Sequence, residues 1–251
     1  MGADTAAPPV QYPCEMCPLR ARKGFRDFYP EELAFVSRFK KGELSVQKGA
    51  TLLMEGSRNP HFYTVLSGWG FRYKLMPDGR RQIVNFAMPG DLVGLQGSLM
   101  EEMQHSVEAL SSMLLCVFER KELYGLYRHF PRLAYDLTWM AAREEVMLDE
   151  NLLSVGRRTA VERVAYLVAS ILDRAASSGL WPKNATEIPI TQQQVADTLG
   201  LSLVHTNKII RKLAERGLLK WVEGGCRVMD LKSLQRLARW EESTLESRPF
   251  L

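Results

Sequence analysis

The chain has 251 residues and a formal net charge of +4, and 46% of its side chains are hydrophobic. This composition supports one large or two ordinary buried cores, excludes wholesale disorder, and fits a polyanionic partner without requiring one. Because the sequence has only four cysteines, no ~20-residue apolar run and no signal-peptide pattern, we expect a soluble, cytoplasmic protein with no membrane partner and no disulfide scaffold.

Residues 1–24 are expected to form a flexible leader that carries a Cys14-x-x-Cys17 pair. Small, polar and proline residues dominate the start of this segment, and such termini are usually poorly ordered. A short helix is predicted over Pro30–Phe39, where apolar residues recur at helical spacing.

Residues 25–125 predict a small antiparallel β-roll. The runs HFYTVLS, FRYKLM, RQIVNFAM and SMLLCVFE are rich in β-branched and aromatic residues, and glycines separate them. The sequence Met76-Pro-Asp-Gly-Arg80 between two of these runs predicts a hairpin, because glycine supplies the positive φ of a tight turn. The many turns and the absence of strand–helix alternation favour a roll over a helical or parallel-sheet domain.

Residues 126–156 are predicted to form one long helix, because apolar residues recur there every three to four positions. Such a stripe packs either on its own β-roll or, as a dimerisation helix, against the same helix of a second copy. Glu144 and Asn151 interrupt some choices of register. Gly156 is expected to end the helix before a second one over residues 159–176. The stripe consists of Leu133, Leu137, Met140, Met147 or Leu148, Leu152 and Val155.

The segment 191–213, TQQQVADTLGLSLVHTNKIIRKL, predicts a helix-turn-helix. Thr191 and Gln194 form a capping-box pattern, Gly200 suits the left-handed residue of the turn, and Ser202 can cap the second helix. The alternative is an ordinary helical hairpin. The core positions of two crossing helices are filled by Val195, Ala196, Leu199, Gly200, Leu201, Thr206 and Ile209.

After the second helix, LLKWVEGGCRVMD predicts a two-stranded wing around Gly224. A helix-turn-helix followed by a wing is a DNA-binding arrangement, so residues 157–251 are expected to bind double-stranded DNA with the second helix in the major groove. Asn207 can pair with adenine and Lys208 can reach guanine. The candidate DNA contacts are Thr191, Gln193, Ser202, Leu203, Val204, His205, Asn207, Lys208 and Arg211.

A β-roll, a long helix and a C-terminal winged helix-turn-helix, together an α+β chain, resemble the Crp/Fnr family of bacterial transcription regulators, in its alphaproteobacterial branch. The most specific pieces are MPGDLVGL at residues 88–95 and ITQQQVADTLGLSLVHTNKIIRKLAERGLL at residues 190–219. The resemblance implies a cyclic-nucleotide-binding-like sensor roll. It also implies a homodimeric activator that binds an inverted-repeat operator and contacts RNA polymerase.

The resemblance also indicates a candidate effector pocket. In the cAMP receptor of this family an Arg-Ser pair holds the cyclic phosphate, and the corresponding residues here are His105 and Ser106. A buried phosphate would lose a bidentate guanidinium contact at this position, so cAMP is not the expected ligand. The candidate pocket residues are Gly90, Asp91, Leu92, His105 and Ser106.

Cys14, Cys17 and Cys116 match three of the four iron–sulfur ligand positions in the oxygen-sensing Fnr branch. Lys23 occupies the remaining clustered position, so one of the usual four thiolates is missing. Ordinary or redox-reactive thiols, an iron–sulfur cluster with an incomplete or non-cysteine ligand set, zinc, and a disulfide switch all remain open.

Two other classes of protein compete with a DNA-binding regulator. One is a regulatory subunit that uses the same roll without binding DNA, which the filled helix-turn-helix positions argue against. The other is a redox or metal enzyme, but the sequence has no nucleophile–base pair, P-loop, HExxH or paired-carboxylate motif, so no enzyme is expected. His61 and His105 could line a haem pocket, although an isolated histidine on a roll is usually structural.

Overall fold

The computed structural model describes residues 12–178, 187–240 and 247–251. The first part of the predicted leader, residues 1–11, therefore lies outside the described residues. A search of the described helices finds none with the length and apolar content needed to cross a bilayer.

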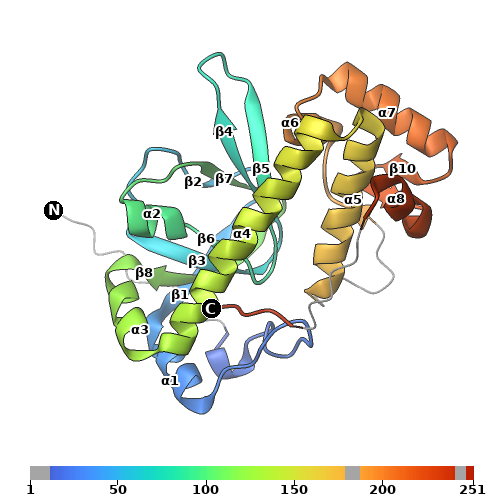
Figure 1. Ribbon diagram of the computed structural model, residues 1–251. Coiled ribbons are helices and arrows are strands. Elements are labelled where there is room, and N and C mark those ends of the chain that lie inside the picture. The colour runs from blue at the N-terminus through green and yellow to red at the C-terminus, as the bar shows by residue number, and fades with distance from the viewer. Residues whose placement is uncertain (1–11, 179–186, 241–246) are drawn as a thin grey trace. The chain divides into compact units, whose positions relative to one another are not determined.

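These residues form two compact units, each built from separate stretches of the chain (Figure 1). Among the described residues, the first unit uses 12–72, 87–143 and 247–251, and the second uses 73–86, 144–178 and 187–240. The chain therefore passes from the first unit to the second and back more than once.

The first unit contains the β-roll. Its strands form two four-stranded sheets, in the orders β1-β8-β3-β6 and β2-β7-β4-β5, and a cluster of Val, Leu, Met, Ala and Tyr side chains forms the core of the roll. Strands β1, β3 and β6 pair antiparallel to their neighbours in the first sheet. The strands are β1 (Lys40–Val46), β2 (Thr51–Leu53), β3 (His61–Ser67), β4 (Gly70–Leu75), β5 (Arg81–Ala87), β6 (Leu92–Val93), β7 (Ser106–Ala109) and β8 (Met113–Glu119).

Short helices flank the roll. The predicted helix over Pro30–Phe39 is present as α1, and the Glu32 carboxylate caps its start by accepting the Tyr29 N–H at 2.8 Å. The others are the 3₁₀ turns η1 (Cys14–Met16) and η2 (Arg120–Glu122), and the helices α2 (Leu95–Met100) and α3 (Leu123–His129).

Residues 12–24, the described part of the predicted leader, pack on α1 and β1. The Leu19 side chain is fully buried, and the Tyr12 N–H donates to the Glu43 carboxylate at 2.9 Å. The Lys40 Nζ donates to the Tyr12 carbonyl at 2.7 Å. The Cys14-x-x-Cys17 pair therefore belongs to the packed roll.

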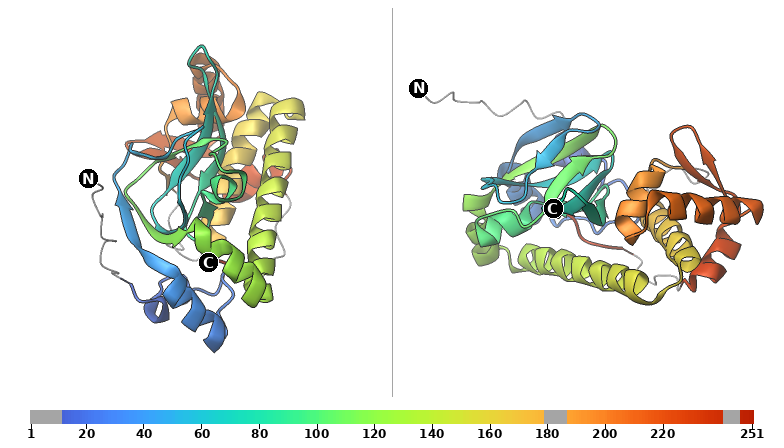
Figure 2. Two further views of the ribbon diagram at one scale, coloured as in Figure 1. Left: turned by 90° about the vertical axis from the view of Figure 1, so that its left-hand side faces the viewer. Right: turned by 90° about the horizontal axis from the view of Figure 1, so that it is seen from above.

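The long helix α4 (Pro131–Arg157) runs on from α3 (Figures 1 and 2). Leu133, Leu137 and Met140 are buried, so this part of the predicted stripe packs within the chain's own first unit. Gly156 lies inside the helix, which continues to Arg157; the prediction that Gly156 ends the helix is therefore wrong by one residue, because glycine near a helix end costs little.

The second unit contains the winged helix-turn-helix. A capping box between Thr159 and Glu162 starts α5, where the sequence predicts a helix. The elements are α5 (Ala160–Ser177), β9 (Glu187–Ile188), α6 (Gln192–Leu199), α7 (Leu203–Glu215), β10 (Leu219–Val222), β11 (Gly225–Val228) and α8 (Leu231–Ala238). The predicted α+β class, with a β-roll, a long helix and a C-terminal winged helix-turn-helix, is confirmed.

Candidate nucleic-acid interface

The turn between α6 and α7 is fixed by local hydrogen bonds. The Thr191 hydroxyl accepts the Gln194 N–H at 3.1 Å, and the Gln194 side chain accepts the Thr191 N–H at 2.8 Å. Gly200 ends α6 with a φ of +64°, and the Ser202 hydroxyl accepts the His205 N–H at 3.2 Å. These caps satisfy donors that a helix start leaves unpaired, so α7 begins at a defined residue.

One side of this helix pair forms a dry core. Thr206 and Leu213 are fully buried on α7, and they face buried side chains of α6. Of the seven predicted helix-turn-helix positions, Val195, Ala196, Leu199, Thr206 and Ile209 are buried and Leu201 is half-buried, while Gly200 forms the turn, as predicted.

The opposite side of α7 is open to solvent. Val204 is 67% exposed and the adjacent Leu203 is 40% exposed, so both apolar side chains are accessible. All nine candidate DNA contacts are exposed: Thr191, Gln193, Ser202, Leu203, Val204, His205, Asn207, Lys208 and Arg211.

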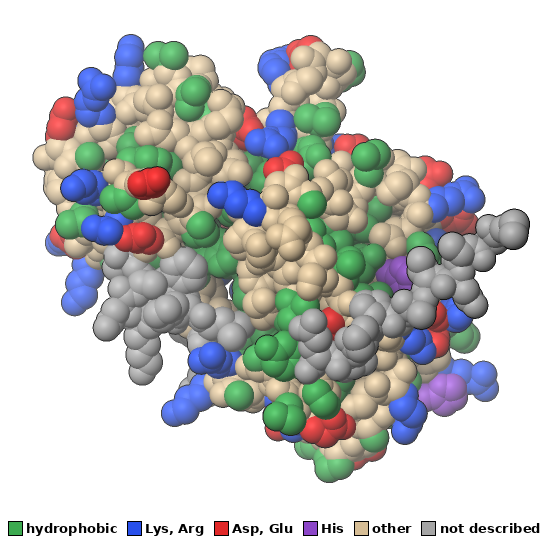
Figure 3. Space-filling model, turned by 180° about the vertical axis from the view of Figure 1, so that it is seen from behind, with side chains coloured by type: hydrophobic (Ala, Val, Ile, Leu, Met, Phe, Trp, Pro, Cys, Tyr) green, Lys and Arg blue, Asp and Glu red, His purple; other side chains and the backbone are tan. Residues whose placement is uncertain are grey.

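The charges on this face are suited to a polyanion. Lys208, Arg211 and Lys212 are exposed, and none of them is in an ion pair with another residue in the described stretches. Lys and Arg side chains also project along the outer edge of this unit (Figure 3). Gln193, by contrast, donates to the Asp197 carboxylate at 2.7 Å, so it is held by its own helix.

The wing is a three-stranded sheet in the order β10-β11-β9. Its third strand, β9, is absent from the prediction, since two residues carry no readable pattern. A side chain on Gly225 would place its Cβ 1.9 Å from the Ile188 carbonyl oxygen, so this pairing requires glycine. Cys226 is fully buried between Trp221 and Ile188, and burial raises the pKa of its thiol to about 12.

Within the second unit, the start of β5, in the β4–β5 hairpin, contacts the helix-turn-helix. The Arg81 guanidinium lies 2.9 Å from the Asp197 carboxylate, and the Gln82 side chain donates to the Thr198 carbonyl at 2.8 Å. Both partners are on α6. The sequence predicts the hairpin but gives no sign of this contact, because the two segments are more than 100 residues apart.

The same hairpin explains the polar residues that interrupt the stripe of α4. Asn151 donates to the Val84 carbonyl at 2.8 Å, and the Glu144 carboxylate accepts from Asn85 at 3.1 Å. Arg174 of α5 also donates to the Asn85 side chain at 3.0 Å. These residues interrupt the apolar pattern because they bind hairpin polar groups.

The candidate effector residues lie on two different sheets. Gly90 and Asp91 form the turn before β6, whereas His105 and Ser106 lead into β7. The Ser106 hydroxyl accepts the Glu55 N–H at 3.0 Å. Asp91 is buried and its carboxylate lies 3.1 Å from the Arg248 guanidinium, so a residue of this chain already engages it.

An open cavity of about 400 Å³ lies elsewhere on the roll and includes the predicted His61. Cationic side chains dominate its wall, which suits a small anion more than haem. It is lined by Arg58, Asn59, Pro60, His61, Glu119, Arg120 and Lys121.

Cys14, Cys17 and Cys116 lie close together around Lys40. Their spacing in the sequence alone could not predict this proximity. Their thiols interact electrostatically with one another and with the Lys40 ammonium, which itself lies 2.6 Å from Glu43. Burial raises the pKa of all three thiols, that of Cys116 to about 12, and the nearby ammonium only partly opposes it.

These donors do not fit the iron–sulfur cluster that the resemblance implies. Such a cluster normally takes four thiolates, whereas the described part of the first unit brings together three, and Cys226 belongs to the other unit. Across the described ranges, no group of three or more His, Cys, Asp or Glu side chains is arranged to hold a metal ion.

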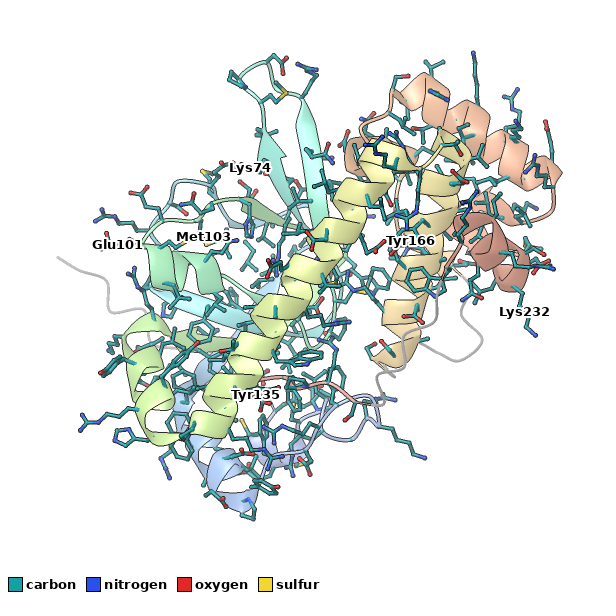
Figure 4. All side chains as sticks on the ribbon, in the orientation of Figure 1. Lys74, Glu101, Met103, Tyr135, Tyr166 and Lys232 are labelled. Carbon is teal, nitrogen blue, oxygen red and sulfur yellow. The ribbon has the colours of Figure 1, made fainter. Side chains whose placement is uncertain are left out.

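A second exposed surface runs along α4. Tyr135, Val146 and Leu153 are 68%, 61% and 45% exposed, and Ala142 is exposed with Trp139 half-buried. Tyr135, Trp139, Ala142 and Val146 are spaced by three or four positions and Leu153 follows after seven, the pattern of a coiled-coil seam. Figure 4 labels Tyr135 near the start of this helix. The seam consists of Tyr135, Trp139, Ala142, Val146 and Leu153, and it differs from the predicted stripe.

Comparison with known proteins gives matches over both units. Residues 43–130 match the model of the cyclic nucleotide-binding domain, and residues 162–237 match the model of the Crp-like helix-turn-helix domain. The two matches cover most of the β-roll and most of the winged helix-turn-helix.

The chain is also similar to characterised proteins. It is 32% identical over 193 residues to the nitrogen fixation regulation protein FixK of Bradyrhizobium diazoefficiens, covering 76% of this chain and 79% of that one. It is 31% identical over 215 residues to the transcriptional activator protein FnrL of Cereibacter sphaeroides, covering 84% and 86%. The solved structure of FixK2 from Bradyrhizobium japonicum superposes with a TM-score of 0.67 at 25% identity, covering 80% of this chain and 98% of that one.

Proposed function

Because the chain belongs to the Crp/Fnr family of bacterial transcription regulators, we propose that it works as a homodimer on an inverted-repeat operator. It is a transcription regulator with a DNA-binding helix-turn-helix, as its relatives are. Its operator contacts, its dimer and its signal are proposed from the structure.

The exposed face of α7 is the observation that carries the proposal. Its buried side locks the helix to α6, and its outer side presents Asn207, Lys208 and Arg211 to solvent. Helix-turn-helix proteins place this helix in the major groove, where such side chains pair with adenine and guanine edges. Thr191 and Ser202 lie at helix starts, where their groups are suited to phosphate contact.

The seam of α4 supports a dimer. Packing these exposed apolar residues on the same seam of a second copy would bury apolar surface and stabilise the dimer. It would leave the core of the first unit unchanged. A two-fold axis along this helix would present two copies of α7, which suits an inverted repeat.

Transcriptional activation is the mode that the name of FnrL suggests, since it is a transcriptional activator protein, and the family resemblance implies contact with RNA polymerase in the cytoplasm. No catalytic role is proposed.

The roll is proposed as a sensor for a signal other than cAMP, because His105 replaces the expected arginine and Asp91 is engaged by Arg248. The alternatives with an iron–sulfur cluster or without DNA binding are less favoured, owing to the missing fourth thiolate and the exposed basic face of α7.

The test is selection of binding sites from a random-sequence DNA duplex library by the full chain. Enriched sequences should form an inverted repeat with half-site centres about one helical turn apart. Recovery of no common sequence, with and without reductant, would refute the operator proposal.

The selected duplex then tests single residues. Lys208→Ala and Arg211→Ala should weaken binding about tenfold or more, since each removes a contact to a base or phosphate. Lys232→Ala is the matched control, because Lys232 is exposed on α8 and extends on the side away from α7 (Figure 4). Equal losses in all three variants would argue against α7 as the reading helix.

A further inference from the structure

The segment Ser247–Leu251 packs on the first unit, although residues 144–246 before it belong to the second. In Figure 1 it is the red segment that ends at the label C. Arg248, Phe250 and Leu251 are only 7%, 2% and 4% exposed. Residues 247–251 are therefore packed into the surface of the first unit, which contains the β-roll.

Backbone hydrogen bonds align the segment with residues 24–26. The Arg248 N–H donates to the Gly24 carbonyl at 3.1 Å, and the Arg26 N–H donates to the Arg248 carbonyl at 2.8 Å. Phe25 and Arg248 form a parallel β-bridge. An extended peptide that adds to an exposed strand in this way is a recurrent mode of peptide recognition.

The Arg248 guanidinium is the centre of the contact. It lies 3.1 Å from the Asp91 carboxylate and donates to the carbonyl of Pro89 at 2.8 Å and that of Gly90 at 3.2 Å. It also lies over the Phe25 ring, 4.8 Å from its centre. Buried ion pairs stabilise when further hydrogen bonds satisfy both groups; here the two carbonyls accept from the guanidinium, and the Met88 N–H donates to the Asp91 carboxylate.

The turn at Gly90 is shaped to receive this side chain. A Cβ at Gly90, whose φ is +85°, would lie 2.2 Å from the Phe25 ring and 2.9 Å from the Arg248 guanidinium. The Phe250 ring then packs edge-on against Phe25, with centroids 5.4 Å apart, and against Phe28 at 4.8 Å. The site therefore has an arginine pocket followed by an aromatic pocket.

We propose that the surface formed by residues 24–28 and the turn 88–91 is a peptide-binding site for an Arg-Pro-Phe-Leu segment, supplied in this chain by residues 248–251. The docked segment acts as a latch that covers this surface of the first unit. This inference is independent of DNA binding.

The latch can open without unfolding the roll. Arg143 lies 3.7 Å from the same Asp91 oxygen, and Asp91 also accepts the Met88 N–H at 2.8 Å. When Arg248 leaves, Asp91 therefore keeps a cation and a donor, and the cost of an uncompensated buried charge is avoided.

Hydrogen–deuterium exchange of the full chain, followed by mass spectrometry, tests the latch. In the wild-type chain the Arg26 and Arg248 amides should exchange at least tenfold more slowly than in unstructured peptide. Arg248→Ala should raise exchange at least tenfold in residues 24–28 and 247–251 and leave β3 and β8 unchanged. Arg248→Lys should give an intermediate result, because it keeps the charge and loses the planar fork.

Arg239→Ala is the control, since this nearby arginine is 86% exposed and lies 3.7 Å from Glu162. It should exchange as the wild type does. The proposal fails if the wild-type amides are unprotected, if Arg248→Ala keeps full protection, or if protection disappears on tenfold dilution, which would mean that a second copy supplies the segment. If Arg248→Ala unfolds β3 and β8, the comparison of the wild type with Arg248→Lys tests the latch. Equal protection of residues 24–28 in these two chains would then refute it.

Discussion

Single residues of α7 show how one helix serves both folding and recognition. Thr206 is fully buried, whereas Val204, two positions earlier, is 67% exposed. Successive positions on a helix differ by about 100°, so a buried face and an outward face alternate within one turn. Val204 can only offer apolar contact, and the thymine methyl group is the matching feature in the major groove.

The thiol of Cys226 leads to a prediction about pH. Its ordinary pKa is near 9, and burial raises it to about 12 in the folded chain. The folded state thus holds a proton that the unfolded state loses as pH rises past 9, so the thiol's stabilising contribution is complete below that pH and is lost above it. Between pH 8 and 10 this loss is about 1.4 kcal/mol of unfolding free energy.

Urea unfolding at several pH values measures this loss. In Cys226→Ala the unfolding free energy should fall less steeply between pH 8 and 10 than in the wild type, by about that amount. Parallel pH curves for the two chains would show that the thiol is not protonated by burial.

At the scale of elements, the sequence predicts what is local and misses what is distant. The capping box at Thr191 and the turn at Gly200 are correctly predicted, because each depends on a few neighbouring residues. The contact of Arg81 with Asp197 and the docking of Arg248 are absent from the prediction, since nothing in a local pattern specifies a partner so far along the chain. The convergence of Cys14, Cys17 and Cys116 was suggested by family resemblance alone.

Two glycines on helices should respond to alanine with opposite signs. Gly200 has a left-handed φ of +64°, so Gly200→Ala should lower the unfolding free energy by about 1 kcal/mol. Gly156 lies inside α4 and an added methyl group meets nothing within 4 Å, so Gly156→Ala should raise it by up to about 1 kcal/mol. Chemical denaturation of both variants provides the measurement, and a stabilising Gly200→Ala would contradict the turn geometry.

At the scale of the whole molecule, the seam of α4 connects the fold with regulation. The exposed Tyr135, Val146 and Leu153 need a partner, and a second copy offers the same residues in return. The latch at Arg248 lies within the first unit of each copy. The dimer and the latch are separable, because they use different surfaces of the chain.

The dimer prediction is tested with two aspartate substitutions on the same helix. Val146→Asp places a charge in the seam and should weaken self-association at least tenfold in sedimentation equilibrium. Leu148→Asp is the control, since Leu148 is 42% exposed but lies on another side of α4. Loss of the dimer in both variants, or in neither, would count against this seam.

The most direct measurement is a hydroxyl-radical footprint of the full chain on the duplex that selection yields. The proposed function predicts two protected half-sites, about one helical turn apart and related by two-fold symmetry, both lost in Lys208→Ala or Arg211→Ala and retained in Lys232→Ala. A single protected site, or uniform protection that does not depend on α7, would contradict it.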